Sequence, residues 1–283
     1  MKNNTGKKIL IVNADDYGMT RSISRGILKT AIDGIVRATT VMTNSHDFDE
    51  RMDELFKECP ELDIGFHANL TWGEPLSDPE EIRTLVNDEG MFLPRITLLR
   101  RSILRQISAN EVYKELSSQY KKLSDRVKNI THIDGHHHIH AFPVIRDIVT
   151  KLAKEHNVQF IRAPHEGLWS SWQWAGTRRA VISALSAAKP MFWKSRGFKC
   201  ADNFGGFALG AGRQIQKRWL ETLIRLPEGI TEIMVHPGHF SPHNDDYNIG
   251  REEEIRMLTN QSLSEAIKDC EIEISSFKNI LLS

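Results

Sequence analysis

Five histidines and one aspartate lie within residues 131–140 of this chain, which has twelve histidines in all. Neutral imidazole is a common metal ligand, and so dense a group of histidines is hard to explain by core packing. In a strand the side chains alternate, so His132, Asp134 and His136 would point to one side, and Gly135 would let the chain turn after Asp134. The internal position excludes an expression tag, and a loop of solvated histidines is the plain alternative. We interpret the group as one half of a metal site.

Polar side chains that could supply the other half stand where other apolar runs end. Asp15 and Asp16 follow the apolar run at 9–12. His67 ends a second run, and His236 follows a third within the sequence His-Pro-Gly-His. In parallel α/β proteins the ligand site lies at the carboxyl ends of the strands, because the loops converge there. We therefore expect all of these side chains in one pocket.

Two adjacent carboxylates repel each other when both are buried, unless a cation shares the site. We therefore expect that one of Asp15 and Asp16 binds a metal and that the other acts as a base beside the metal-bound water. The simple alternative for Asp16 is that it caps the following helix. A lone histidine such as His67 is more often structural, but beside the other ligands it becomes a metal candidate.

One carboxylate and two imidazoles leave coordination positions open for water and substrate, which is typical of catalytic metal sites. Such a set of N and O ligands accepts Zn, Mn, Co, Ni, Fe or Mg. A bound divalent ion polarises an acyl oxygen and lowers the pKa of its water from about 15.7 to roughly 7. The predicted chemistry is metal-assisted hydrolysis. A metal-dependent phosphoesterase and a non-catalytic sugar- or metal-binding barrel stay open as alternatives.

Alternating strands and helices are predicted to position these residues, which is the pattern of a parallel α/β architecture. The predicted strands cover 9–12, 38–43, 62–67, a short stretch that ends near 135, 158–163, 231–235 and 272–275, and 13–18 are predicted as a loop. The predicted helices cover 22–32, 47–58, 109–127, 144–155, 176–189, 213–226 and 251–268. Because no internal repeat or linker divides the chain, we expect one domain over 1–283, with less regular excursions near 73–106 and 165–212.

Composition excludes several classes of protein. The chain has 37 Lys+Arg and 37 Asp+Glu, and this zero net charge argues against a nucleic-acid-binding surface. Three widely spaced cysteines suit neither a disulfide framework nor a thiolate metal site. The first apolar run is too short for a signal peptide or a transmembrane segment, so a cytoplasmic location is expected. The arginines at 95–105 are interpreted as a solvated surface, whereas the tryptophans of 165–212 fit sugar stacking and plain packing equally well.

Four motifs, in order and spacing, resemble the YdjC-like carbohydrate deacetylase family across residues 8–275. They are Asn13-Ala14-Asp15-Asp16-Tyr17-Gly18, Gly65-Phe66-His67, His132-Ile133-Asp134-Gly135-His136-His137-His138-Ile139-His140 and His236-Pro237-Gly238. The glycine-rich segment 204–212 and the sequence Tyr247…Arg251-Glu252-Glu253-Glu254 are more similar to the branch associated with hopanoid biosynthesis than to the chitooligosaccharide branch. The chain departs from the common pattern at Gly135, where Ser is frequent, and at Tyr17, where Phe is frequent. Neither position supplies a ligand.

The resemblance implies a (β/α) barrel of the glycoside hydrolase/deacetylase type, distorted or seven-stranded. It implies removal of an N-acetyl group from an amino sugar, oligosaccharide or glycolipid, with one divalent metal such as Mg, while Zn, Mn, Co and Ni stay open. The expected partner is this small N-acetylated carbohydrate, and a homodimer stays open.

The resemblance also implies roles for individual residues. His67 and His136 would bind the metal, with Asp16 as the third ligand. Asp15 would be the general base, and His236 the acid or the stabiliser of the oxyanion. By the same analogy Asp15 and Asp16 could exchange roles, and spacing alone does not choose between His136 and the nearby His138 and His140.

Overall fold

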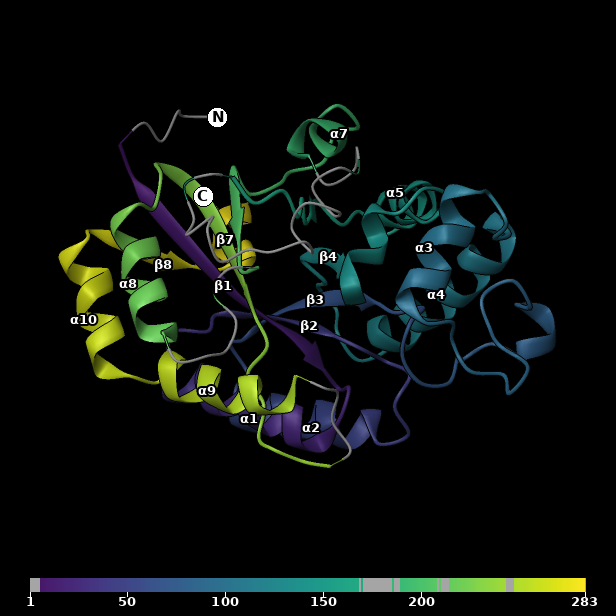
Figure 1. Cartoon of the computed structure of the whole chain (residues 1–283), viewed down its shortest axis with the longest axis horizontal. Helices are drawn as coiled ribbons and strands as arrows, with labels where there is room; N and C mark the ends of the chain where they lie inside the picture. The colour runs from purple at the N-terminus through teal and green to yellow at the C-terminus, as the bar shows by residue number, and fades with distance from the viewer. Residues whose placement is uncertain are drawn as a thin grey trace.

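The computed structural model of the protein describes residues 6–167, 169, 185, 189–207, 209, 214–242 and 247–282. At its centre lies a curled sheet of parallel strands (Figure 1). The strands are β1 (Lys8–Tyr17), β2 (Ala38–Val41), β3 (Asp63–Ala68), β4 (His132–Gly135), β5 (Phe160–Ile161), β6 (Asn203–Gly205), β7 (Gly229–Val235) and β8 (Ile272–Ser275). Their order along the sheet is β5-β4-β3-β2-β1-β7-β6, and β8 pairs with β1.

The two ends of the sheet approach each other, which makes the fold a distorted barrel. Phe160 of β5 forms a parallel bridge with Lys199, and Glu166 forms one with Phe204 of β6. The amide of Ile161 also donates a hydrogen bond to the carbonyl of Lys199 at 3.0 Å. The predicted α/β class, with a distorted (β/α) barrel, is confirmed.

β1 is the central strand, and all of its ten residues except Lys8 are buried. Along one edge it pairs with β7 from Lys8 to Ala14. Along the other edge it pairs first with β8, from Lys8 to Ile11, and then with β2, from Asn13 to Tyr17. The prediction of a loop at 13–18 was therefore wrong. The polar residues of this stretch continue the strand because β2 supplies their backbone partners.

Helices cover the outside of the sheet (Figure 1). They are α1 (Arg21–Ile32), α2 (Phe48–Glu58), α3 (Arg95–Ile103), α4 (Ala109–Ser124), α5 (Ile145–Glu155), α7 (Pro190–Lys194), α8 (Ile215–Ile224), α9 (Asn248–Leu258), α10 (Gln261–Asp269) and α11 (Phe277–Leu282), with the short 3₁₀ segments η1 (Pro79–Glu81) and η2 (His136–Ala141). α1 buries Ile23, Ile27 and Leu28 at the spacing of one helix face. Its N-cap is Thr20, whose hydroxyl accepts a hydrogen bond from the amide of Ile23, so Asp16 is not the cap.

The interior of the barrel is polar near the carboxyl ends of the strands. His132 Nε2 lies 3.0 Å from Asn13 Oδ1, and the hydroxyl of Thr40 donates to Asp134 Oδ2 at 3.1 Å. His132 and Asp134 therefore share the inward face of β4, as the period of two predicts. Asn13 and Asp15 share the inward face of β1 in the same way, because the Asn13 amide donates to Asp15 Oδ1 at 2.8 Å. These alternating positions bring polar groups from several strands together.

Most of the other predicted elements are present within a few residues of their predicted bounds. The excursion at 73–106 is more regular than predicted, because it contains η1 and the nine-residue helix α3. The residues after β4 form η2 rather than an open loop. The predicted helix at 176–189 falls almost entirely outside the described residues, and the single domain stays a prediction. Within the described residues no helix is both long and apolar enough to span a membrane.

Candidate active site

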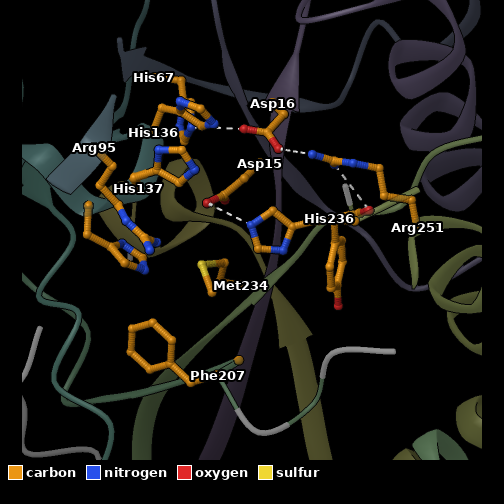
Figure 2. A pocket seen from close by; sticks show the side chains of 13 residues that line it. Asp15, Asp16, His67, Arg95, His136, His137, Phe207, Met234, His236 and Arg251 are labelled. Atoms are coloured by element: carbon orange, nitrogen blue, oxygen red, sulfur yellow. Dashed lines mark hydrogen bonds and ion pairs between the residues drawn. The ribbon is translucent and has the colours of Figure 1, made fainter. Parts of the chain in front are cut away.

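One pocket at the carboxyl ends of the strands contains the five residues to which the family resemblance assigned a role (Figure 2). Asp15 and Asp16 come from β1, His67 from β3, His136 from the start of η2 and His236 from the residue after β7. The pocket is lined by Asp15, Asp16, His67, Arg95, His136, His137, His138, Gly206, Phe207, Met234, His236, Tyr247 and Arg251. The interpretation of the 95–105 arginines as a solvated surface was wrong for Arg95, because this residue begins α3 and lines the pocket.

A bulge in β1 lets two consecutive carboxylates enter the same pocket. In a regular strand the side chains of Asp15 and Asp16 would point to opposite faces. Asp16 instead has a φ of +73°, and the pairing of β1 with β2 shifts register between Ala14 and Tyr17. Both carboxylates are 2% exposed. A positive φ at a residue other than glycine is uncommon and costs conformational free energy, and such strain is concentrated at functional sites.

Each of these two carboxylates has its own guanidinium partner. Arg162 binds both oxygens of Asp15, with 2.7 Å between Nη2 and Oδ1, and Arg251 Nη2 lies 2.7 Å from Asp16 Oδ2. Burial alone would raise the pKa of either aspartate, but Arg162 at Asp15 and Arg251 at Asp16, together with the neighbouring histidines, hold both pKa values well below the usual range. Part of the repulsion expected between the two carboxylates is therefore relieved by arginines.

Arg162 is also shared with two more buried carboxylates. Its Nη1 lies 2.7 Å from Asp134 Oδ2, and its Nε donates to Glu232 Oε1 at 2.6 Å. One guanidinium cannot neutralise three carboxylates. Burial accordingly raises the pKa of Glu232 to about 7, against the attraction of Arg162 and with the repulsion of Asp134 and Asp15.

His67 lies between Asp134 and Asp16. Its Nδ1 is 2.6 Å from Asp134 Oδ1 and 3.0 Å from the hydroxyl of Thr40, while its Nε2 is 3.2 Å from Asp16 Oδ1. Burial would lower the pKa of His67, but the attraction of Asp134, followed by that of Asp16 and Asp15, raises it to about 10. The carboxylates around His67 therefore favour a positive charge at this position, in addition to the charges of Arg162 and Arg251.

Two atoms that face each other here make no hydrogen bond within the described part of the chain. They are Asp16 Oδ1 and His67 Nε2, and both are buried. A buried polar atom without a partner is costly. Adjacent ligands at roughly 2.1 Å from one ion lie roughly 3 Å apart, close to the 3.2 Å between these atoms. The donor set at this point therefore fits a divalent cation.

A second set of potential ligands overlaps with the first. Asp15, His67 and Asp134 each offer one ligand atom, and these atoms lie within 4.8 Å of one another, so this buried group could hold a metal ion. The oxygens of Asp15 and Asp134 are, however, already paired with Arg162, His67 and Thr40. The buried atoms without a hydrogen bond belong to Asp16 and His67, and on that ground we favour the side of the pocket where these two meet.

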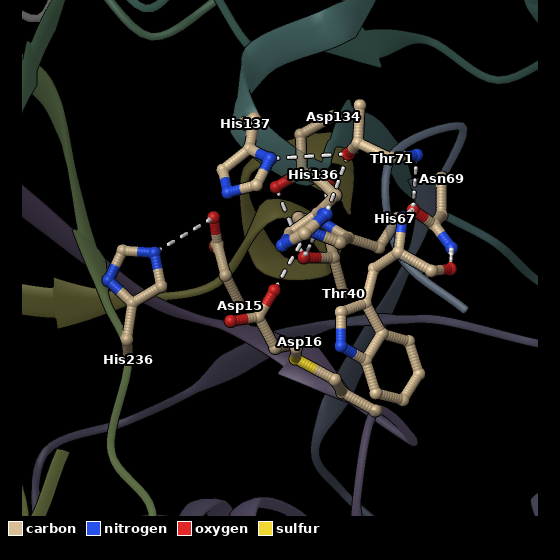
Figure 3. A network of polar contacts seen from close by, with 12 residues as sticks. Asp15, Asp16, Thr40, His67, Asn69, Thr71, Asp134, His136, His137 and His236 are labelled. Carbon is tan, nitrogen blue, oxygen red and sulfur yellow. Dashed lines mark hydrogen bonds and ion pairs between the residues drawn. The ribbon is translucent and has the colours of Figure 1, made fainter. Parts of the chain in front are cut away.

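His136 borders this side of the pocket. Its Nδ1 lies 2.9 Å from the hydroxyl of Thr71, which leaves Nε2 for a further partner (Figure 3). Burial lowers the pKa of His136 to about 4 against the opposing effect of Asp16, so the imidazole is neutral, the form that binds metals. Of the two alternatives to His136, His138 also lines the pocket, packed against Phe207 at 5.1 Å between ring centroids. His140 Nε2 instead lies 3.1 Å from the carbonyl oxygen of Arg162, outside the pocket lining.

His236 stands across the pocket from these ligands. Its Nε2 lies 4.0 Å from Asp15 Oδ2, and its side chain is 27% exposed (Figure 2). The loop that carries it is held by α9, because the His236 amide donates to the carboxylate of Glu254 and Arg251 Nη1 donates to the His236 carbonyl at 3.3 Å. The hydroxyl of Tyr247 donates to the other oxygen of Glu254 at 2.9 Å.

Several residues of this network were not assigned a role from the sequence. Asp134 stood inside the histidine motif, and Arg251 and Glu254 were noted only for their resemblance to a branch of the family. The signal for Arg162 was present, because it is a charged residue inside the predicted buried strand 158–163 and such a residue requires a partner. The partners themselves come from distant segments, which local patterns do not connect.

The fold and the pocket define a class of protein: a curled parallel (β/α) barrel with histidines and carboxylates at the carboxyl ends of its strands. The chain belongs to the family of YdjC-like proteins, whose model matches residues 9–269. A carbohydrate deacetylase from Brevibacillus brevis is 33% identical over 280 residues, which cover 96% of this chain and 99% of the relative. A carbohydrate deacetylase from Thermoanaerobacter pseudethanolicus is 29% identical over 276 residues, 95% of this chain and 98% of the relative.

A solved structure supports the same fold. It is the crystal structure of an Enterococcus faecalis protein, provisionally described as a cellobiose-phosphate cleavage protein, with a TM-score of 0.78 and 24% identity over 97% of this chain and 99% of that chain. The family resemblance inferred from the motifs is thus confirmed. The resemblance to the hopanoid-associated branch stays a prediction.

Proposed function

We propose that this protein is a metal-dependent hydrolase that removes the N-acetyl group of an amino sugar, in a mono- or oligosaccharide or a glycolipid. The observation that carries the proposal is the pair of buried atoms Asp16 Oδ1 and His67 Nε2, which lie 3.2 Å apart at ion-pair distance and make no hydrogen bond in the described chain. They lie in the same pocket as Asp15 and His236, which are suited to move protons. The carbohydrate deacetylases related to this chain over nearly its whole length support the reaction class.

Asp16, His67 and His136 would hold the ion. When bound, a divalent ion would polarise the acetyl carbonyl and acidify the attacking water. Mg is the expectation from the family, and the same donors accept Zn, Mn, Co or Ni. Asp134 would orient His67 through the 2.6 Å contact at Nδ1, and Thr71 would orient His136 in the same way. Such partners fix the tautomer and the orientation of a ligating imidazole.

Asp15 is proposed as the general base that takes a proton from the attacking water. Its low pKa keeps it ionised, and the Asn13 amide and Arg162 hold its carboxylate in one orientation. Oδ2 faces His236 at 4.0 Å. The opposite assignment, with Asp15 as ligand and Asp16 as base, would place the base on an oxygen that makes no hydrogen bond in the described residues and lies 3.2 Å from His67 Nε2. The contacts favour the first assignment.

His236 is proposed as the acid that protonates the departing amine. The water oxygen adds to the acetyl carbon, the C–N bond breaks, and the sugar nitrogen takes the proton while acetate leaves. Partial exposure of His236 lets the ring exchange protons with solvent after each turnover. The cytoplasmic location and the single domain are proposed on the sequence alone, and a homodimer stays open.

The proposal is tested by acetate release from N-acetylated mono- and oligosaccharides and glycolipids. The protein is first stripped of metal, and single divalent ions are then added back. We expect acetate only with an added ion. Release of phosphate from phosphoesters in the same samples, without acetate, would overturn the deacetylase and favour the phosphoesterase. Ion binding without turnover on either panel would favour a non-catalytic barrel.

A further inference from the structure

The hydroxyl of Thr71 lies between two imidazoles. It is 2.9 Å from His136 Nδ1 and 3.2 Å from His137 Nδ1 (Figure 3). The two rings stack, with 3.8 Å between centroids and 29° between planes. His136 is buried, whereas His137 is exposed on the pocket wall. The proposed metal reaction uses His136 and leaves His137 without a role.

Thr71 is held rigidly by the turn that follows β3. The side-chain oxygen of Asn69 accepts hydrogen bonds from the amides of Thr71 and Trp72 at 3.0 and 3.1 Å. Asn69 is fully buried, and its side-chain amide donates to Asn44 Oδ1 at 3.0 Å. Gln119 of α4 pairs with the backbone of Asn69 on both sides. The backbone of Thr71 is therefore held by this turn, and its hydroxyl contacts the two imidazoles.

The protons in this chain of contacts can be assigned if His136 binds an ion through Nε2. Its Nδ1 must then carry the ring proton and donate it to the Thr71 oxygen. In the described residues, His137 Nδ1 is the acceptor within reach of the single hydroxyl proton of Thr71. If His137 Nδ1 accepts this proton, the one ring proton of neutral His137 is on Nε2.

The backbone supplies an independent observation. His137 and His138 are consecutive residues with left-handed φ values of 56° and 59°. This conformation is uncommon outside glycine, and two in a row are found where the surroundings enforce them. The strained turn keeps the ring on the pocket wall, with the nitrogen opposite Thr71 on the side of Asp15 and His236 (Figure 3).

We propose that His137 is a substrate-positioning residue, which donates a hydrogen bond from Nε2–H to a hydroxyl of the amino sugar, and that Thr71 sets its tautomer. The proposal rests on the proposed deacetylase function, because the proton assignment begins at the His136 metal ligand. The donor lies beside the ring of His136, so a sugar held by it has its acetamido group close to the proposed ligands. A sugar without a hydroxyl at that position would lose the contact.

The tautomer is tested by ¹⁵N NMR of histidine-labelled protein loaded with a diamagnetic ion such as Mg or Zn. The signals of His137 are identified by their loss in His137→Gln. We expect the proton of His137 on Nε2 and that of His136 on Nδ1. A proton on Nδ1 of His137 would overturn the relay. This measurement needs no turnover, so it stands even if the protein releases no acetate.

The substrate contact is tested by kinetics on an N-acetylated sugar that the wild type deacetylates. His137→Leu removes the donor, whereas His137→Gln keeps an amide N–H near the same position. We expect His137→Leu to raise KM roughly tenfold, since a net hydrogen bond of this kind has about that effect on binding. We expect His137→Gln to recover most of the loss, with kcat and ion content close to wild type in both variants. An unchanged KM in His137→Leu would overturn the contact.

Thr71 offers a matched pair of variants for the relay. Thr71→Val keeps the shape and removes the hydroxyl, and Thr71→Ser restores the hydroxyl. The first should weaken ion binding through His136 and raise KM through His137, and the second should reverse both changes. An effect of Thr71→Val on ion binding alone would overturn the link to His137. Failure of the wild type itself to release acetate would instead reject the proposed function.

Discussion

The two sides of the pocket are equally buried but are bonded very differently. On the side of β5 and β7, Asp15 has a bidentate contact with Arg162, and Arg162 has further carboxylate partners in Asp134 and Glu232. On the side of β3 and β4, Asp16 Oδ1 and His67 Nε2 face each other without a hydrogen bond in the described chain. A buried network that is satisfied needs no further ligand, whereas an unsatisfied one does. The comparison separates the side that holds the proposed base from the side that holds the proposed metal ligands.

The largest expected effect comes from breaking the unsatisfied side. His67→Ala removes a proposed ligand, so the protein should lose its ion and with it all acetate release. Ion content after dialysis, measured by elemental analysis, checks this. The matched control is His236→Ala, which alters the opposite side of the pocket and should retain the ion while losing most activity. An ion content equal to wild type in His67→Ala would remove His67 from the ligand set.

The next effect comes from the satisfied side. Asp15→Asn keeps an oxygen that can accept from Arg162 but removes the base, so kcat should fall by roughly 10²–10⁴-fold. Ion content should stay unchanged, whereas Asp16→Asn should lower it. If Asp15→Asn loses the ion and Asp16→Asn keeps it, the roles of the two aspartates are exchanged, and the group of Asp15, His67 and Asp134 becomes the ligand set.

A smaller effect is expected where the two sides meet. Asp134 contacts His67 Nδ1 and Arg162 Nη1, and so belongs to both networks. Asp134→Asn leaves His67 in place but weakens its orientation, and partners of this kind change metal affinity by roughly 10–100-fold. Titration of the stripped protein with the ion measures the change. An ion content as low as that of His67→Ala would indicate that Asp134 is itself a ligand.

The same comparison explains how much could be predicted from the sequence. The ligands on the unsatisfied side could be predicted, because Asp16, His67 and His136 each come after an apolar run or at its end, and the carboxyl ends of parallel strands converge. The arginine partners of both aspartates could not be predicted. Arg162 is 147 residues from Asp15, and Arg251 is 235 residues from Asp16.

Local periodicity also fails at the bulge of β1, because the polar residues 13–18 predict a loop where the strand continues to Tyr17. The pairing of this stretch with β2 is tertiary, and tertiary pairing overrides local propensity. The alternation of strands and helices, by contrast, is a local pattern, and the α/β class could be read from it. Partners that lie far apart in the sequence, such as Arg162 and Asp15, can be identified only from the folded structure.

The smallest expected effect is on stability and comes from the excess of carboxylates around Arg162. Burial raises the pKa of Glu232 to about 7, above the ordinary value of 4.5. The folded state therefore binds a proton more tightly than the unfolded state, and the stability due to protonated Glu232 is complete below pH 4.5 and is lost as the pH rises through 7. Glu232→Gln has no such loss. Its free energy of unfolding relative to wild type should thus rise between pH 5 and pH 8, by on the order of 2 kcal/mol.

Denaturant unfolding at several pH values, with a chelator present, measures this difference. The raised pKa of His67 and the lowered pKa of Asp15 also make stability depend on pH, but both groups are present in the two proteins, so most of their contribution cancels in the difference. Glu89→Gln, at an exposed carboxylate, is the control and should follow wild type at every pH. If Glu232→Gln also ran parallel to wild type, Glu232 would be ionised throughout. Arg162 would then hold all three of its carboxylate partners in the ionised form, and the carboxylates around it would not be in excess.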